Sequence, residues 1–155
     1  MKTELWWIGK TFEPYIKTGI DDYMKRLQRF TQIQTAELAD VKGISDAKIV
    51  KWKEAAKILE KLKPDDHLIL LDEKGKTYTS SGFSKLIGQK EGQSLKKVVF
   101  LIGGAFGFDE QIYKRANDRI SLSGMTYSHQ LIRLIFLEQL YRAYTILHNF
   151  PYHND

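Results

Sequence analysis

Three loops in this chain combine glycine with polar residues directly after apolar segments of strand length. They run from Asp72 to Gly75 after HLILL, from Gly103 to Gly107 after VVFLI, and from Gly124 to Tyr127 after RISLS. Glycine permits positive φ and close backbone approach, so main-chain N–H and C=O groups can recognise a ligand there. Ligands of open α/β sheets bind beyond the carboxyl ends of the strands. The pattern therefore predicts a backbone-lined pocket that suits adenosine.

The glycine spacing of the second loop argues against two common nucleotide sites. Gly103-Gly104-x-x-Gly107 is not the GxGxxG fingerprint of dinucleotide-binding proteins, and no Lys-Ser or Lys-Thr pair completes a P-loop. Each loop taken singly is more often a plain turn than a binding site. The predicted pocket therefore depends on all three loops meeting at one edge of a sheet.

A second set of side chains, near the C-terminus, offers acid–base or charge chemistry. Imidazole titrates near neutral pH, so His129 or His153 suits a proton acceptor or relay, and His129 directly follows the third loop. Glu138 and Arg142 are one helical turn apart and can form an ion pair that is either catalytic or purely structural. Tyr152 and His153 are close enough to the chain end to be frayed and idle.

Composition narrows the class of protein. The chain has no cysteine, and its four histidines lack the spacing of a zinc site, so no thiolate chemistry or metal centre is predicted. The net charge of +5 is as consistent with a polyanion partner such as RNA as with a solvated surface. The apolar run at the N-terminus is far shorter than a signal peptide or membrane span. These features predict a cytoplasmic protein that is not embedded in a membrane.

The elements that must position these residues alternate between strand-length and helix-length segments, which predicts an α/β fold with a parallel sheet. The third and fourth strands are continuously apolar, as expected at a sheet centre. A chain of 155 residues fits one domain spanning 1–155. The predicted strands are Leu5–Ile8, Ile33–Leu38, His67–Leu71, Val98–Ile102 and Arg119–Leu122, and the predicted helices are 12–30, 45–62, 80–89, 109–117 and 128–148.

Two of these helices carry further hypotheses. The helix over 45–62 places Lys53, Lys57 and Lys61 on one face, which either tracks phosphates or is a solvated face. In the second case Ile49, Trp52, Ala56 and Leu59 face the core. The helix over 128–148 is apolar nearly all round, which predicts that it packs on the sheet and on a partner subunit in a homodimer.

The phrase FLIGGAFGF and the C-terminal run SLSGMTYSHQLIRLIFLEQLYRAYTILHNFPYH resemble the RlmH family of SPOUT-class methyltransferases. The opening LWWIGK and the segment HLILLDEKGK fall at matching places, so the resemblance covers essentially the whole chain. It implies a C-terminal trefoil knot, a homodimer and S-adenosyl-L-methionine as cofactor. Knots are otherwise nearly absent from proteins. The matching positions for the cofactor are Leu71, Gly103, Gly104, Leu122, Ser123, Gly124, Met125, Thr126 and Tyr127.

The substrate implied by the resemblance is a pseudouridine of large-subunit (23S) rRNA, methylated at N3 on the assembled ribosome. For the catalytic side we expect His129 or His153 to accept the proton and Tyr152 to stack on or orient the base. Arg142, oriented by Glu138, would hold a phosphate or the carbonyl oxygens of the base. Relatives often carry a basic residue after the terminal Tyr-His, where this chain has Asn154 and Asp155, and an acidic residue where it has Phe106.

Two rival hypotheses remain open at this stage. A non-catalytic, ribosome-associated RNA-binding protein would use the basic faces without a methyl donor. An adenine-nucleotide sensor would use the same loops, and ATP or AMP would then bind with similar affinity.

Overall fold

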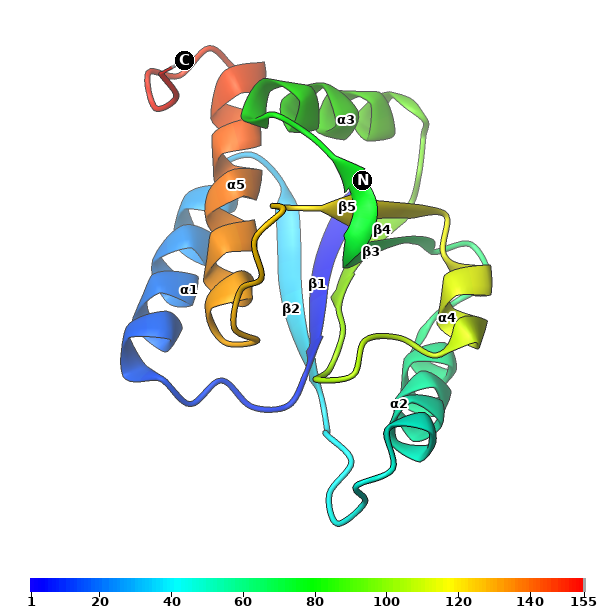
Figure 1. Cartoon of the computed structure of the whole chain (residues 1–155). Coiled ribbons are helices and arrows are strands. Elements are labelled where there is room, and N and C mark those ends of the chain that lie inside the picture. Colours follow the sequence, from blue (N-terminus) through cyan, green and yellow to red (C-terminus); the bar gives the residue numbers. More distant parts are fainter. Residues whose placement is uncertain (155) are drawn as a thin grey trace.

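The computed structural model describes residues 1–154. Asp155, which follows Asn154 after the terminal Tyr-His, lies outside the described residues. Strands and helices alternate along the chain in the predicted order, so the α/β prediction is confirmed (Figure 1). The strands are β1 (Lys2–Ile8), β2 (Gln32–Leu38), β3 (His67–Thr77), β4 (Lys97–Ile102) and β5 (Asp118–Ser121). The helices are α1 (Pro14–Leu27), α2 (Ala47–Lys61), α3 (Ser80–Gly92), α4 (Glu110–Arg115) and α5 (Leu131–Leu147).

The sheet is parallel throughout, with the strand order β2-β1-β4-β3-β5. The prediction that the third and fourth strands lie in its centre is confirmed, since β4 is the middle strand and β3 pairs with it. The trefoil knot and the homodimer implied by the resemblance stay predictions.

Alternation along each strand supplies two separate apolar layers. Phe100 and Ile102 of β4 pack in one layer with residues of α1, α3 and α5, while Val99 and Leu101 pack in the other, together with Ile58 of α2. Figure 1 shows α1 and α5 side by side on one face of the sheet and α2 and α4 together on the other. Both faces of the sheet are therefore covered, and its carboxyl edge is where loops are free to form a site.

The third strand differs from the prediction, because it continues past Leu71 to Thr77. Leu71 and Lys76 both pair with Ile120 of β5, so residues 72–75 bulge out of the ladder between them. At the end of this bulge Gly75 lies against the backbone of β5, where an added Cβ would stand 2.6 Å from the carbonyl carbon of Ile120. The bulge therefore holds the first of the three loops at the sheet edge.

The predicted core face of α2 is wrong for Ile49, Trp52 and Ala56, and only Leu59 packs against the core as predicted. Val50, Glu54, Ala55 and Ile58 are buried, whereas Trp52 is 59% exposed. Ile49 is also exposed, at 44%, as is Ala56. The buried face of the helix differs from the prediction because it contains a carboxylate, Glu54, which an apolar periodicity assigns to solvent.

The apolar character of α5 is interrupted by a buried charge. Arg133 is 2% exposed and donates hydrogen bonds to the carbonyl oxygen of Ile8 and to Thr11 Oγ1 at 2.9 and 2.8 Å. Its guanidinium also stands 5.1 Å from the ring centroid of Trp7. Arg133 therefore ties α5 to the end of β1 rather than facing a solvent-exposed side.

A polar cluster lies where β3 and β5 begin, at the edge of the sheet opposite the carboxyl ends of the strands, and it makes the stability of the fold depend on pH. Asp118 of β5 accepts hydrogen bonds from Lys90 Nζ and His67 Nε2, both at 2.8 Å. Burial of Asp118 opposes its ionisation, but these hydrogen bonds and the neighbouring charges outweigh burial and lower the pKa of Asp118. A lowered pKa adds stability that is complete above the unfolded-state pKa and is lost as the pH falls through the folded-state pKa.

We therefore expect Asp118→Asn to lower the free energy of unfolding at about pH 7 and to converge on wild type as the pH falls through the lowered pKa of Asp118. Urea unfolding across this range measures it. The matched control is Asp22→Asn, because Asp22 pairs with Arg26 where both side chains are largely exposed. A constant difference between Asp118→Asn and wild type over the whole range would contradict the linkage.

Candidate active site at the carboxyl edge of the sheet

A cavity of about 430 Å³ lies beyond the carboxyl ends of β3, β4 and β5. This volume falls within the range of pockets that bind small molecules. The three glycine loops meet around it, so the prediction that they converge at one edge is confirmed. The lining residues are Leu71, Asp72, Glu73, Lys74, Ile102, Gly103, Gly104, Ala105, Phe106, Gly107, Phe108, Tyr113, Ser121, Leu122, Ser123, Met125, Thr126, Tyr127, His129 and Ile132.

All of the residues expected to hold the cofactor except Gly124 line this cavity. Gly124 is exposed, at a turn in which Ser123 Oγ accepts a hydrogen bond from the N–H of Met125 at 2.9 Å. The third loop therefore presents Leu122, Ser123 and the residues after Gly124 to the cavity.

The second loop is shaped by glycine at each of its three glycine positions. Gly107 has φ of +82° and donates a backbone hydrogen bond to the carbonyl oxygen of Gly104 at 3.2 Å. A Cβ on Gly103 would stand 3.1 Å from the Phe108 ring, and one on Gly104 would stand 2.6 Å from Glu54 Oε2. The loop thus packs between the cavity in front and two buried side chains behind. Space favours glycine at Gly103 and Gly104, whereas the positive φ favours it at Gly107.

Two polar residues of the cavity wall were missed as site residues. Asp72 follows Leu71 directly, and its Oδ2 atom is buried without a hydrogen-bond partner among residues 1–154. Tyr113 comes from α4, and burial together with the neighbouring Asp72 carboxylate raises its pKa to about 12. Position after a strand end was a signal for Asp72, whereas nothing in the sequence placed one tyrosine of a short helix at the cavity. The Asp72 carboxylate, which has the Tyr113 hydroxyl beside it, can accept an N–H or O–H group of a ligand through Oδ2.

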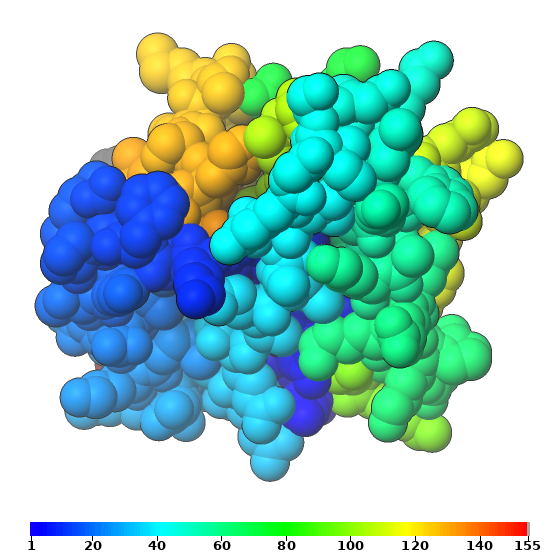
Figure 2. Space-filling view, turned by 90° about the horizontal axis from the view of Figure 1, so that it is seen from below, coloured from blue at the N-terminus to red at the C-terminus, as the bar shows by residue number. Residues whose placement is uncertain are grey.

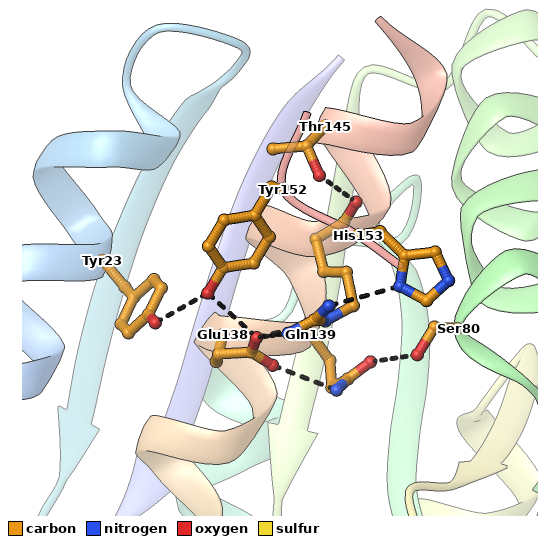
Figure 3. Close-up of polar contacts among 8 residues, drawn as sticks. Tyr23, Ser80, Glu138, Gln139, Thr145, Tyr152 and His153 are labelled. Carbon is orange, nitrogen blue, oxygen red and sulfur yellow. Dashed lines mark hydrogen bonds and ion pairs between the residues drawn. The ribbon is translucent and has the colours of Figure 1, made fainter. Parts of the chain in front are cut away.

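The predicted catalytic residues fall into two places. His129 lines the cavity, and no hydrogen bond to its side chain is present within the described part of the chain. Glu138, Arg142, Tyr152 and His153 instead form a network where the C-terminal tail folds back over α5 (Figure 3). Glu138 is seven residues after the start of α5, or about 10 Å along its axis, so the two places are distinct.

The network confirms the predicted ion pair. Glu138 Oε1 accepts hydrogen bonds from Arg142 Nε and from the Tyr152 hydroxyl, both at 3.1 Å. Arg142 Nη1 lies 3.2 Å from His153 Nδ1, and the Tyr152 hydroxyl lies 2.9 Å from that of Tyr23 on α1. The tail is not frayed over the described residues, because Asn149 with φ of +58° turns it back and the Phe150 N–H bonds to the Thr145 carbonyl oxygen at 2.9 Å.

Charge and burial set the protonation of this network. The hydrogen bond to Glu138 raises the pKa of Arg142, with burial opposing it. Burial raises the pKa of Tyr152, and its contacts with Tyr23 and Glu138 raise it further. Tyr152 is therefore a neutral hydroxyl donor at neutral pH, and Arg142 is a fixed cation.

A smaller hollow of about 140 Å³ adjoins the cavity and reaches Gln139 of α5, the neighbour of Glu138. It shares Ser121, Leu122 and Tyr127 with the cavity, and its far wall is Ser80 and Gln139. Ser80 Oγ donates to Gln139 Oε1 at 2.9 Å, and Gln139 Nε2 donates to Glu138 Oε2 at 3.0 Å, as Figure 3 shows. A chain of hydrogen bonds thus runs from the far wall of this hollow to the Glu138–Arg142 pair.

Two further searches concern residues 1–154 only. No cluster of three or more histidine or acidic side chains in a metal-binding arrangement occurs among them. None of the helices described there is both long enough and apolar enough to cross a membrane.

The sequence matches a known family over almost its whole length. The family described as "Predicted SPOUT methyltransferase" matches residues 1–153. "Ribosomal RNA large subunit methyltransferase H" of Flavobacterium johnsoniae is 47% identical over 157 aligned residues that cover 100% of both chains. The protein of the same name from Parabacteroides distasonis is 46% identical with the same coverage. The chain therefore belongs to the SPOUT methyltransferase family, in the group of the RlmH proteins.

Proposed function

We propose that this protein is an S-adenosyl-L-methionine-dependent methyltransferase that modifies N3 of a pseudouridine in 23S rRNA, acting in the cytoplasm on assembled ribosomes. The observation that carries the proposal is the cavity at the carboxyl edge, walled by three glycine loops, in a chain whose relatives are named as large-subunit rRNA methyltransferases. The whole chain acts as one domain in this proposal.

The cavity fits the cofactor by its donors and acceptors. Bound S-adenosyl-L-methionine supplies an electrophilic methyl group. The main chain of Gly103, Gly104 and the Leu122 to Tyr127 segment would hold the adenosine part, because these loops present N–H and C=O groups rather than bulky side chains. Leu71 supplies an apolar wall, and the buried, unpaired Asp72 Oδ2 would accept from an amino or hydroxyl group.

The two places that carry candidate catalytic residues suggest a division of labour. The N3 imide must lose its proton to become a nucleophile, and His129 is the imidazole at the cavity wall. Arg142 and His153 at the network would hold phosphate or base oxygens, and Tyr152 would orient the base. The hollow between Tyr127 and Gln139 would accommodate part of the nucleotide between them.

We expect His129→Ala to lower the single-turnover methylation rate by about 100-fold, the usual contribution of a general base. His153→Ala should weaken ribosome binding by about tenfold and leave the rate at saturation within about threefold. The control is His148→Ala, which changes an exposed histidine at the end of α5. Rapid-quench assays with unmodified ribosomes measure both, and wild-type rates in His129→Ala and His153→Ala together would remove either as the sole base.

Two measurements test the function as a whole. Calorimetry of the folded protein should show S-adenosyl-L-methionine binding that ATP and AMP do not compete for, whereas an adenine-nucleotide sensor requires such competition. Mass-spectrometric mapping of rRNA from cells with and without the protein should show loss of one methyl group on one pseudouridine. Unchanged rRNA in the deletion strain would contradict the proposed substrate.

The homodimer belongs to the same proposal. Phe12 and Tyr15 are each 65% exposed, and Leu131 is 36% exposed. The Phe12 N–H bonds to Gln130 Oε1 at 3.0 Å, which places this apolar group at the junction of α1 and α5. A second copy would bury these side chains, and sedimentation of the purified protein measures whether the particle has the mass of two chains.

A further inference from the structure

Helix α2 exposes a large aromatic side chain that the fold does not use. Trp52 is 59% exposed, whereas Trp6 and Trp7 are 0% and 5% exposed. Figure 2 shows α2 and the segment leading into it at the surface of this side of the molecule. Exposing this much of an indole to water is unfavourable, and a bound partner that covers the ring would remove that cost.

The surroundings of Trp52 are cationic. Lys48 stands one turn before Trp52 on the same face of the helix, and Lys53 is its neighbour in sequence, and both are exposed. Two acidic residues are near in sequence: Glu54 is buried on the opposite side of the helix, and Asp46 caps the helix start by accepting from the N–H groups of Lys48 and Ile49 at 2.9 and 3.4 Å. Lys57 is less available, since its amine donates to the Ala39 carbonyl oxygen at 3.0 Å. We call the surface formed by Lys48, Ile49, Trp52 and Lys53 the Trp52 face. It combines an aromatic plane with two lysines that form no ion pair within residues 1–154.

Helix α2 also packs behind the candidate active site, through its other side. Lys51 and Glu54 of α2 line a small hollow together with Gly103, Gly104 and Gly107, the glycines of the second loop. The front of that loop faces the cavity and its back faces α2. The Trp52 face is the side of α2 turned away from this loop, so RNA bound there would pass around the helix from the cavity.

We propose that the Trp52 face binds a single-stranded segment of the RNA substrate, with one base stacked on the Trp52 indole and its phosphates beside Lys48 and Lys53. Stacking on an exposed aromatic ring flanked by cations is how proteins hold unpaired nucleotides without reading their sequence. Charge favours RNA over a second copy of this chain, since a second Trp52 face would bring lysines against lysines. This inference rests on the proposed function, because it takes RNA as the partner.

The tryptophan distribution gives a direct test. A single-stranded RNA of about 12 nucleotides should quench the emission of Trp52, and the quenching should disappear in Trp52→Leu, whose remaining indoles are buried. Trp52→Leu should bind this RNA about tenfold more weakly, while Trp52→Phe stays within about threefold of wild type. Ile49→Ala is the matched control, because it removes an exposed apolar side chain of the same face without removing a ring.

The same variants separate this inference from the proposed function. With ribosomes as substrate, Trp52→Leu should raise KM about tenfold and leave kcat and S-adenosyl-L-methionine affinity unchanged. Wild-type RNA affinity and KM in Trp52→Leu would overturn the inference while leaving the methyltransferase intact. Loss of self-association in Trp52→Leu, measured by sedimentation, would also overturn it in favour of a second copy. Quenching by RNA in a wild-type protein that transfers no methyl group would instead refute the proposed function alone.

Discussion

Gly75→Ala is expected to lower the free energy of unfolding by about 3 kcal/mol, the upper range for overpacking at a site that cannot relax. An added Cβ would stand 2.6, 2.7 and 2.8 Å from three backbone atoms of Ile120 and Arg119. These are main-chain atoms of β5, so no side chain can rotate out of the way. Relief requires β3 and β5 to separate where Lys76 and Thr77 pair with Ile120 and Ser121.

Urea unfolding monitored by circular dichroism measures this loss. Gly92→Ala is the matched control, since a Cβ there would meet no atom within 4 Å, and the same substitution should be neutral or slightly stabilising. Because Ser121 and Leu122 follow directly in the cavity wall, Gly75→Ala should also weaken cofactor binding in the fraction that remains folded. A Gly75→Ala protein as stable as the Gly92→Ala protein would show that the bulge is not held in this close approach.

The order of the elements and the place of the site were accessible from sequence because each depends on local pattern plus a general rule of parallel sheets. HLILL and VVFLI are too uniformly apolar for a sheet with one wet face, so they had to be interior strands. Once the sheet is parallel, its carboxyl ends share one edge, and the loops after Leu71, Ile102 and Ser121 must lie near one another.

Features that depend on contacts between distant segments of the chain could not be predicted from the sequence. The bulge over residues 72–75 arises from the register of β3 against β5, which no local pattern encodes. The orientation of α2 depends on the burial of Glu54, a residue that apolar periodicity assigns to solvent. The exposure of Trp52 is the direct consequence, and with it the surface proposed above.

The candidate catalytic side chains show the same division between features set by local sequence and features set by distant contacts. The ion pair of Glu138 with Arg142 follows from helical spacing alone and was predicted. His129 and His153 lie in separate places because the tail returns over α5 and brings His153 beside Arg142. The hollow that reaches Gln139 likewise depends on how distant segments pack. A list of suitable residue types could not assign them to one place or two.

Gly104→Ala is expected to weaken S-adenosyl-L-methionine binding at least about tenfold, because the glycine loop and Glu54 occupy adjoining space. The added Cβ would stand 2.6 and 2.8 Å from the two carboxylate oxygens of Glu54. Glu54 is 6% exposed, and burial, followed by the charge of Asp40, raises its pKa while Lys57 opposes the rise. A carboxylate so enclosed has little room to retreat, so the loop must move toward the cavity instead.

This explanation predicts a specific rescue. Since the obstruction is a side chain rather than backbone, Glu54→Ala combined with Gly104→Ala should restore cofactor affinity to within about threefold of wild type, a coupling of about 1 kcal/mol or more. Glu60→Ala is the control, because it removes an exposed carboxylate from the same helix and should rescue nothing. Calorimetry on wild type, Gly104→Ala, Glu54→Ala and the double variant measures the coupling. If Gly104→Ala binds the cofactor equally weakly whether or not Glu54 is replaced, Glu54 is not the obstruction. Glycine would then be required because the main chain of the loop itself contacts the cofactor.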